Sequence, residues 1–201
     1  MHVYMVRCTG VKTALEVSMR VISGCAKGHK LVAPQGINTR PTTDRIKETL
    51  FNVISADVYG SKVLDIFCGS GAIGIEALSR NARISYFIDN DDEALSVLEQ
   101  NLVHTKLKEK AIIIKSDAVE AIRKLGLKEE KFDIVFLDPP YASDLYLSVL
   151  ESVLKEGILS KEGIIIVEQS SKDDIPLING LKLIKEKKFG TTKMSFWSLE
   201  D

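Results

Sequence analysis

The chain has 201 residues, of which 45% are hydrophobic, and its formal net charge is −1. This length and composition predict one domain with a sizeable core, and the near-zero net charge gives no general support for nucleic-acid binding. No segment reaches the roughly 20 apolar residues of a membrane span, so we expect a cytosolic protein. Cys8, Cys25 and Cys68 lack paired metal-ligand spacing, which argues against zinc and against a disulfide. The absence of a long coiled-coil pattern predicts a monomer.

Basic residues are concentrated near the beginning of the chain. Residues 19–56 are predicted to form a flexible basic hairpin followed by a helix. Thr43 is a candidate N-cap of that helix. The positive charges could contact phosphates, although such a stretch is also typical of a solvated surface. The candidate phosphate-contacting residues are Arg20, Lys27, Lys30, Arg40 and Arg45.

Residues 63–74 are predicted to form a strand at 63–67, a glycine-rich turn and the start of a helix. The spacing of Gly69, Gly71 and Gly74 is typical of a nucleotide-binding turn, because glycine permits a tight bend and a close approach of the backbone to a ligand. Ser70 lies inside this turn. Asp65 lies in the strand just before it. The Asp65 carboxylate could hold the charged amino-acid end of S-adenosylmethionine, or it could brace the loop.

Two further strands are predicted at 84–88 and 111–115, with helices at 91–104 and 117–125. The first strand ends in Asp89, which is placed to accept hydrogen bonds from ribose hydroxyls, although an NAD site would share this acid. Asp117 follows the second strand. It could accept from an adenine amine or cap the helix that begins there.

An acid, two prolines and an aromatic residue follow the apolar strand predicted at 132–137. Pro139 and Pro140 cannot donate backbone hydrogen bonds, so carbonyl oxygens lie beside the Asp138 carboxylate. The exocyclic amine of a base could donate to Asp138 and to the Pro139 carbonyl while the base stacks on Tyr141. The alternative is a strand-ending turn with a surface tyrosine.

The remaining pattern predicts an α/β fold. A fifth strand at 163–167 ends before Glu168, which could border the base pocket or be an ordinary charge at a strand end. Strands at 181–185 and 194–199 are close enough in sequence to form a terminal hairpin. We therefore predict a Rossmann-like, mostly parallel seven-stranded sheet with helices on both faces, as in S-adenosylmethionine-dependent methyltransferases.

Three blocks, residues 40–52, 65–80 and 138–141, together resemble the small-subunit ribosomal RNA guanine-N2 methyltransferases, the RsmD family. The glycine turn and the acid-Pro-Pro-aromatic turn occur in many amino-methyltransferases. The first block, Arg-Pro-Thr-Thr-Asp-Arg joined to Leu-Phe-Asn, is the most specific. The resemblance extends from about residue 19 to the end of the chain. Residues 1–18 are therefore expected to be an extension outside the family pattern, either from an upstream start or as a short addition.

The resemblance implies a methyltransferase domain at 57–201 that transfers a methyl group from S-adenosylmethionine to N2 of a guanine in 16S ribosomal RNA. The implied substrate lies in an assembling or assembled 30S particle, and the basic residues named above would contact RNA. The implied catalytic residues are Asp138, Pro139, Pro140 and Tyr141. The implied cofactor-binding residues are Asp65, Gly69, Ser70, Gly71, Gly74, Asp89, Asp117 and Thr43.

Three residues depart from the common family pattern. The ribose acid is Asp89 where glutamate is common, Asp117 is asparagine in some relatives, and Tyr141 is often phenylalanine. These differences are chemically conservative, so they leave the expected reaction class unchanged.

Other functions fit the same residues. An adenine-N6 methyltransferase acting on DNA or RNA would also use the Asp-Pro-Pro-Tyr turn, although the first block and the lack of a separate target-recognition domain disfavour DNA. A non-catalytic RNA-binding assembly factor would tolerate Asp138→Ala. A dehydrogenase is disfavoured, because nothing after Asp117 suggests a hydride-transfer site.

Overall fold

Seven strands form one central sheet in the computed structural model, which describes residues 19–34, 44–139, 145–173, 175–176 and 178–200. The order across the sheet is β5 (Ala111–Lys115), β4 (Ile84–Asp89), β3 (Lys62–Ile66), β6 (Phe132–Leu137), β7 (Leu159–Ser170), β9 (Thr192–Leu199) and β8 (Leu181–Phe189). The first five strands in this order, β5, β4, β3, β6 and β7, are parallel to one another, whereas β9 is antiparallel to both of its neighbours. The predicted seven-stranded fold is confirmed.

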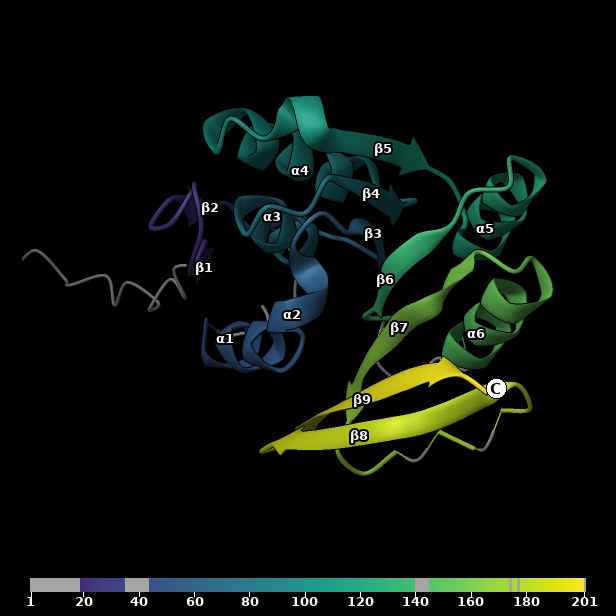
Figure 1. Cartoon of the computed structure of the whole chain (residues 1–201). Coiled ribbons are helices and arrows are strands. Elements are labelled where there is room, and N and C mark those ends of the chain that lie inside the picture. Colours follow the sequence, from purple (N-terminus) through teal and green to yellow (C-terminus); the bar gives the residue numbers. More distant parts are fainter. Residues whose placement is uncertain (1–18, 35–43, 140–144, 174, 177, 201) are drawn as a thin grey trace, which may run out of the picture.

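Helices cover both faces of the sheet (Figure 1). One face carries α1 (Asp44–Val53), α2 (Ser55–Val58), α3 (Ala72–Ser79) and α4 (Asp92–His104). The other carries α5 (Ala118–Leu127) and α6 (Leu145–Lys155). A short 3-10 helix, η1 (Lys108–Lys110), leads into β5. Within the described ranges, no helix has the length and apolar character needed to cross a bilayer.

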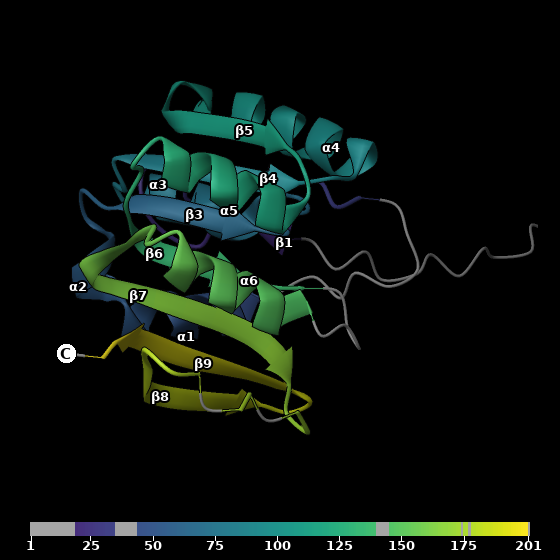
Figure 2. The ribbon, with the colours of Figure 1, turned by 90° about the vertical axis from the view of Figure 1, so that its right-hand side faces the viewer.

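Alternate residues of each central strand point into two separate cores. Val63 and Phe136 face the core under α1 to α4, whereas Leu64 and Val135 face the core under α5 and α6. Because both faces are covered, these strands read as continuous apolar runs in the sequence, as buried parallel strands do. Figure 2 shows that the parallel strands all point toward one edge of the sheet.

Some element boundaries differ from the sequence prediction. Strand β3 ends at Ile66, because Phe67 has a φ of 62° in the left-handed region and cannot continue an extended strand. Strand β7 is longer than the apolar run at 163–167, since its partially polar ends also pair with β6 and β9. The terminal hairpin is confirmed by the pairing of β8 with β9.

The beginning of the described chain packs on the same core as the sheet. Strands β1 (Met19–Arg20) and β2 (Lys30–Leu31) pair antiparallel through two residue pairs. Met19 and Leu31 from this hairpin, and Leu50 and Phe51 from α1, are buried in the core on the α1 to α4 face. Residues 1–18 lie outside the described part of the chain.

Candidate functional site

Acidic side chains stand at the carboxyl ends of five adjacent strands. Because parallel strands end at one edge of a sheet, as Figure 2 shows, these residues line the same edge. In sheet order they are Asp117 after β5, Asp89 at the end of β4, Asp65 in β3, Asp138 after β6 and Glu168 in β7. Open α/β sheets bind ligands at this edge, so the predicted site residues come together where a ligand is expected.

The glycine turn between β3 and α3 has the backbone conformation that its sequence predicts. Gly69 and Gly71 have φ values of 51° and 76°, where side chains are disfavoured. A Cβ atom added at Gly71 would lie 2.2 Å from Leu98 Cδ1, whereas one added at Gly69 would meet no atom within 4 Å. Gly71 is therefore required for packing, and Gly69 leaves open space beside the backbone.

Asp65 and Asp89 hold this turn in place. The Gly74 amide donates to Asp65 Oδ2 at 2.9 Å, and the Gly69 amide donates to Asp89 Oδ2 at 2.9 Å. The other oxygen of Asp89 accepts from the Asp91 amide at 3.0 Å. Burial raises the pKa of Asp65 to about 8. The hydrogen bond from the Gly74 amide lowers this pKa, and the nearby Asp89 charge raises it. The bracing contact considered for Asp65 is present, and a cofactor contact stays a prediction.

The other predicted cofactor residues make contacts of their own. Asp117 caps α5 by accepting from the amides of Val119 at 2.9 Å and Glu120 at 3.2 Å. The Ser70 side chain is buried and its hydroxyl lies 3.7 Å from the sulfur of Met19. Asp117 is therefore a helix cap through Oδ1, and its Oδ2 keeps acceptor capacity. Thr43 lies outside the described residues.

Asp138 and Glu168 lie side by side across β6 and β7. Phe136 pairs with Ile166, and both face the core under α1 to α4. Asp138 and Glu168 lie two residues further along the chain from these partners, and side chains two residues apart in extended chain share a face. Burial raises the pKa of Asp138 well above its usual value, and the charges of Glu168 and Asp65 raise it further. Pro139 follows directly at the sheet edge. Pro140 and Tyr141 lie outside the described residues.

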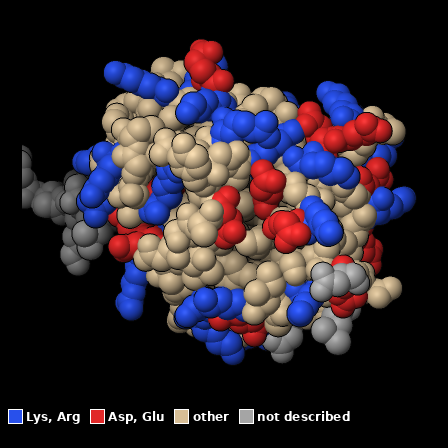
Figure 3. All heavy atoms as spheres, viewed as in Figure 1, with Lys and Arg blue, Asp and Glu red and all other residues tan. Residues whose placement is uncertain are grey.

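Four of the five predicted RNA-contacting residues are described, and all four have exposed side chains. They are Arg20, Lys27, Lys30 and Arg45. Arg20 Nε donates to Asp44 Oδ2 at 2.8 Å, so its charge is partly neutralised. The face seen in Figure 1 carries interspersed acidic and basic side chains and offers no continuous positive surface (Figure 3). Arg40 is not among the described residues.

The sequence prediction missed a buried polar cluster behind the glycine turn. Glu76 and Lys47 are fully buried, and the Glu76 carboxylate also pairs with Arg80. The spacing of Glu76 and Arg80, one helical turn apart, is the only local signal for this cluster. Among the described residues, no group of three or more His, Cys, Asp or Glu side chains is arranged to hold a metal ion.

The chain is similar to known proteins over nearly its full length. The family model described as Conserved hypothetical protein 95 matches residues 19–198. "Putative rRNA methyltransferase YlbH" of Bacillus subtilis is 36% identical over 180 residues, which are 89% of this chain and 98% of that protein. "Ribosomal RNA small subunit methyltransferase D" of Escherichia coli is 35% identical over 160 residues, which are 80% of this chain and 79% of that protein.

Solved structures share the same fold. "Putative methyltransferase yhhF from Escherichia coli" has a TM-score of 0.81 and 34% identity, and the match covers 91% of this chain and 98% of that one. The structure titled "Crystal structure of SMU.776, a putative methyltransferase complexed with SAH" has a TM-score of 0.62 at 14% identity, covering 74% of this chain and 48% of that one. The second similarity concerns the fold alone.

Proposed function

The chain belongs to the family described as Conserved hypothetical protein 95, which includes ribosomal RNA methyltransferases, and from this premise we propose that it methylates the exocyclic N2 of a guanine in small-subunit ribosomal RNA. The observation that carries the proposal is the position of Asp138 and Pro139 at the sheet edge. They follow β6, which pairs with β3, the strand that leads into the glycine turn. This arrangement puts acceptors for an amine beside a nucleotide-type turn.

The residues at the first three strand ends fit S-adenosylmethionine. This cofactor carries its methyl group on a positively charged sulfur and supplies it to a nucleophile. Its amino group, ribose hydroxyls and adenine amine are all hydrogen-bond donors. Asp65, Asp89 and Asp117 offer acceptors in that order across adjacent strands, and the open space at Gly69 leaves room for a ligand beside the backbone.

Asp138 and the Pro139 carbonyl would hold the N2 amine through its two hydrogens. The lone pair of this nitrogen is delocalised into the ring, so two acceptors favour a more pyramidal and more reactive nitrogen. Catalysis then consists of positioning and electrostatic stabilisation. The nitrogen–carbon bond forms as the sulfur–carbon bond breaks, and one proton leaves the nitrogen. We assign Asp138 as the acceptor of that proton, because its carboxylate would already accept a hydrogen bond from the amine.

The test is transfer of labelled methyl from S-adenosylmethionine to naked small-subunit RNA and to partly assembled particles, followed by identification of the modified nucleoside. We expect N2-methylguanosine from the wild-type protein and at least a 100-fold lower rate from Asp138→Ala, the order of magnitude for loss of a positioned acid or base. Equal rates for the two proteins would contradict the assigned role of Asp138.

An adenine-N6 methyltransferase is the second candidate, because Asp138 and Pro139 offer the same acceptors to an adenine amine. The nucleoside analysis separates the two. N6-methyladenosine as the product would replace the guanine proposal, whichever RNA carries the modification.

A further inference from the structure

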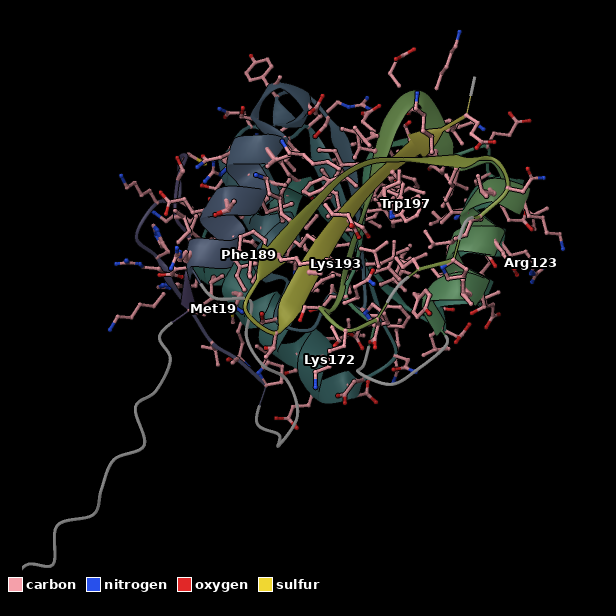
Figure 4. All side chains as sticks on the ribbon, turned by 90° about the horizontal axis from the view of Figure 1, so that it is seen from below. Met19, Arg123, Lys172, Phe189, Lys193 and Trp197 are labelled. Carbon is pink, nitrogen blue, oxygen red and sulfur yellow. The ribbon has the colours of Figure 1, made fainter. Side chains whose placement is uncertain are left out.

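The hairpin of β1 and β2 cannot hold its position through its own ladder. Its ladder pairs Met19 with Leu31 and Arg20 with Lys30, and two further backbone hydrogen bonds link Val21 with His29 and with Gly28. An isolated two-stranded hairpin is at best marginally stable in water. The hairpin carries three of the basic residues expected to contact RNA, namely Arg20, Lys27 and Lys30. Figure 4 shows Met19, where the hairpin begins, beside α1 and on the opposite side of the molecule from Arg123 of α5.

A buried carboxylate of α3 supplies the missing anchor. Glu76 is fully buried, and its two oxygens accept from the Ile22 amide at 2.7 Å and the Ser23 amide at 3.0 Å. Arg80 Nε donates to the same carboxylate at 2.7 Å, and Lys47 Nζ of α1 lies 3.7 Å from it. Each of these four partners of Glu76 is a donor, and they come from the hairpin, from α1 and from the end of α3.

The partners of Glu76 extend this network. Lys47 Nζ also donates to the Arg20 carbonyl at 2.5 Å, so one ammonium group joins the hairpin to α1. Burial lowers the pKa of Lys47, and the adjacent Glu76 charge opposes this effect. The Arg80 guanidinium lies 4.8 Å from the centre of the Phe51 ring. A charge at position 76 thus keeps a buried lysine and a partly buried arginine paired.

Ser79 forms a second anchor one helical turn further along α3. Its hydroxyl donates to the Ser23 carbonyl at 2.5 Å and accepts from the Ala26 amide at 2.9 Å. The fit is close, because a Cβ atom added at Gly24 would lie 1.8 Å from the Ser79 carbonyl oxygen. The helix that begins at the glycine turn therefore fixes the hairpin through two side chains.

We propose that Glu76 is a positioning residue for RNA binding, whose carboxylate locks the basic hairpin and α1 to the helix that follows the glycine turn. The inference rests on the proposed RNA substrate. Glu76 touches neither the cofactor edge nor Asp138, so it acts through the hairpin. In Glu76→Gln the amide nitrogen replaces one oxygen and faces donors, and the hairpin loses its fixed orientation.

The experiment measures binding of naked small-subunit RNA at several salt concentrations, together with KM and kcat, for Glu76→Gln, Glu76→Asp and Ser79→Ala. Glu130→Gln is the matched control, because Glu130 pairs with Lys62 at the start of β3, at the opposite end of the strand from the glycine turn. All measurements are made well below each variant's melting temperature. Cofactor affinity is measured alongside as a check on the glycine turn.

For Glu76→Gln we expect RNA affinity and KM to weaken about 10-fold or more, with kcat and cofactor affinity changed less than about threefold. Each lost phosphate contact lowers the slope of log affinity against log salt by about 0.7–0.9, so loss of the three hairpin contacts lowers it by about 2–3. Glu76→Asp, which keeps the charge, should restore part of the slope, and Ser79→Ala should shift it in the same direction as Glu76→Gln.

A purely structural role would lower the melting temperature of Glu76→Gln and leave the salt slope at the wild-type value, as we expect for Glu130→Gln. An unchanged slope would therefore overturn the inference. If Glu76→Gln does not fold, Ser79→Ala decides by the same criterion. Failure of the proposed function is distinct, because the wild-type protein itself would then neither bind nor methylate the RNA.

Discussion

Alanine substitutions at two glycines of the same turn should have clearly different effects on stability. Both Gly69 and Gly71 have positive φ values, so a side chain at either costs about 1–2 kcal/mol in the backbone. At Gly71 the new Cβ would also lie 2.2 Å from Leu98 Cδ1. Such overpacking typically destabilises the fold by a further amount of about 1–3 kcal/mol. Gly69→Ala meets no atom within 4 Å, so it carries the backbone cost alone.

The assay is thermal and urea unfolding of both variants without cofactor. A loss of 1 kcal/mol lowers the melting temperature of a chain of this size by roughly 2–4 °C, so Gly71→Ala should melt about 2–12 °C below Gly69→Ala. Despite its smaller loss of stability, Gly69→Ala should bind S-adenosylmethionine more weakly than wild type, because its Cβ fills the open space beside the turn.

A double-mutant cycle tests the physical cause. Leu98→Ala removes the atom that Cβ of residue 71 would meet, so the Gly71→Ala and Leu98→Ala losses should be less than additive by about 1–3 kcal/mol. Additive losses, or equal melting temperatures for the two glycine variants, would refute the steric argument.

Two further predictions concern titration. The pKa of Asp65 is raised to about 8, so its contribution to stability is fully present near pH 4 and is lost as the pH rises toward 8. The unfolding free energy of Asp65→Asn should therefore fall less than that of wild type between pH 5 and pH 8. Urea unfolding at both pH values measures this, and an equal fall for the two proteins would contradict the prediction. Glu168→Gln removes a charge that raises the pKa of Asp138, so the acidic limb of the kcat/KM profile should move to lower pH. Glu162→Gln, an exposed change on the same strand, should leave that limb in place.

Residues close together in sequence made the sheet and the glycine turn predictable. Each central strand is a mainly apolar run, and Gly69, Gly71 and Gly74 mark the turn directly. The acids that follow these runs could also be assigned to one site, because parallel strands bring their carboxyl ends to one edge.

The contacts between distant segments were not predictable in this way. The hairpin was expected to be flexible because it contains Gly24 and Gly28, yet Glu76, Ser79 and Asn101 hold it. A buried glutamate in an otherwise apolar helix indicates a polar partner, but nothing in the sequence identifies that partner. Likewise, bracing of the loop was one of two roles considered for Asp65, whereas Asp89 was assigned to a ligand. The backbone amides from which the two carboxylates accept depend on the folded shape of the turn.

These long-range anchors set the order in which a nascent chain can fold. The Ile22 amide meets its acceptor 54 residues later in the chain, and the Val32 amide meets Asn101 after 69 residues. At about 5–20 residues per second, the ribosome needs roughly 3–14 s to synthesise that interval. The basic segment is therefore made first and docks only after α3 and α4 have emerged, so its positive charges stay exposed to RNA and to other chains throughout that time.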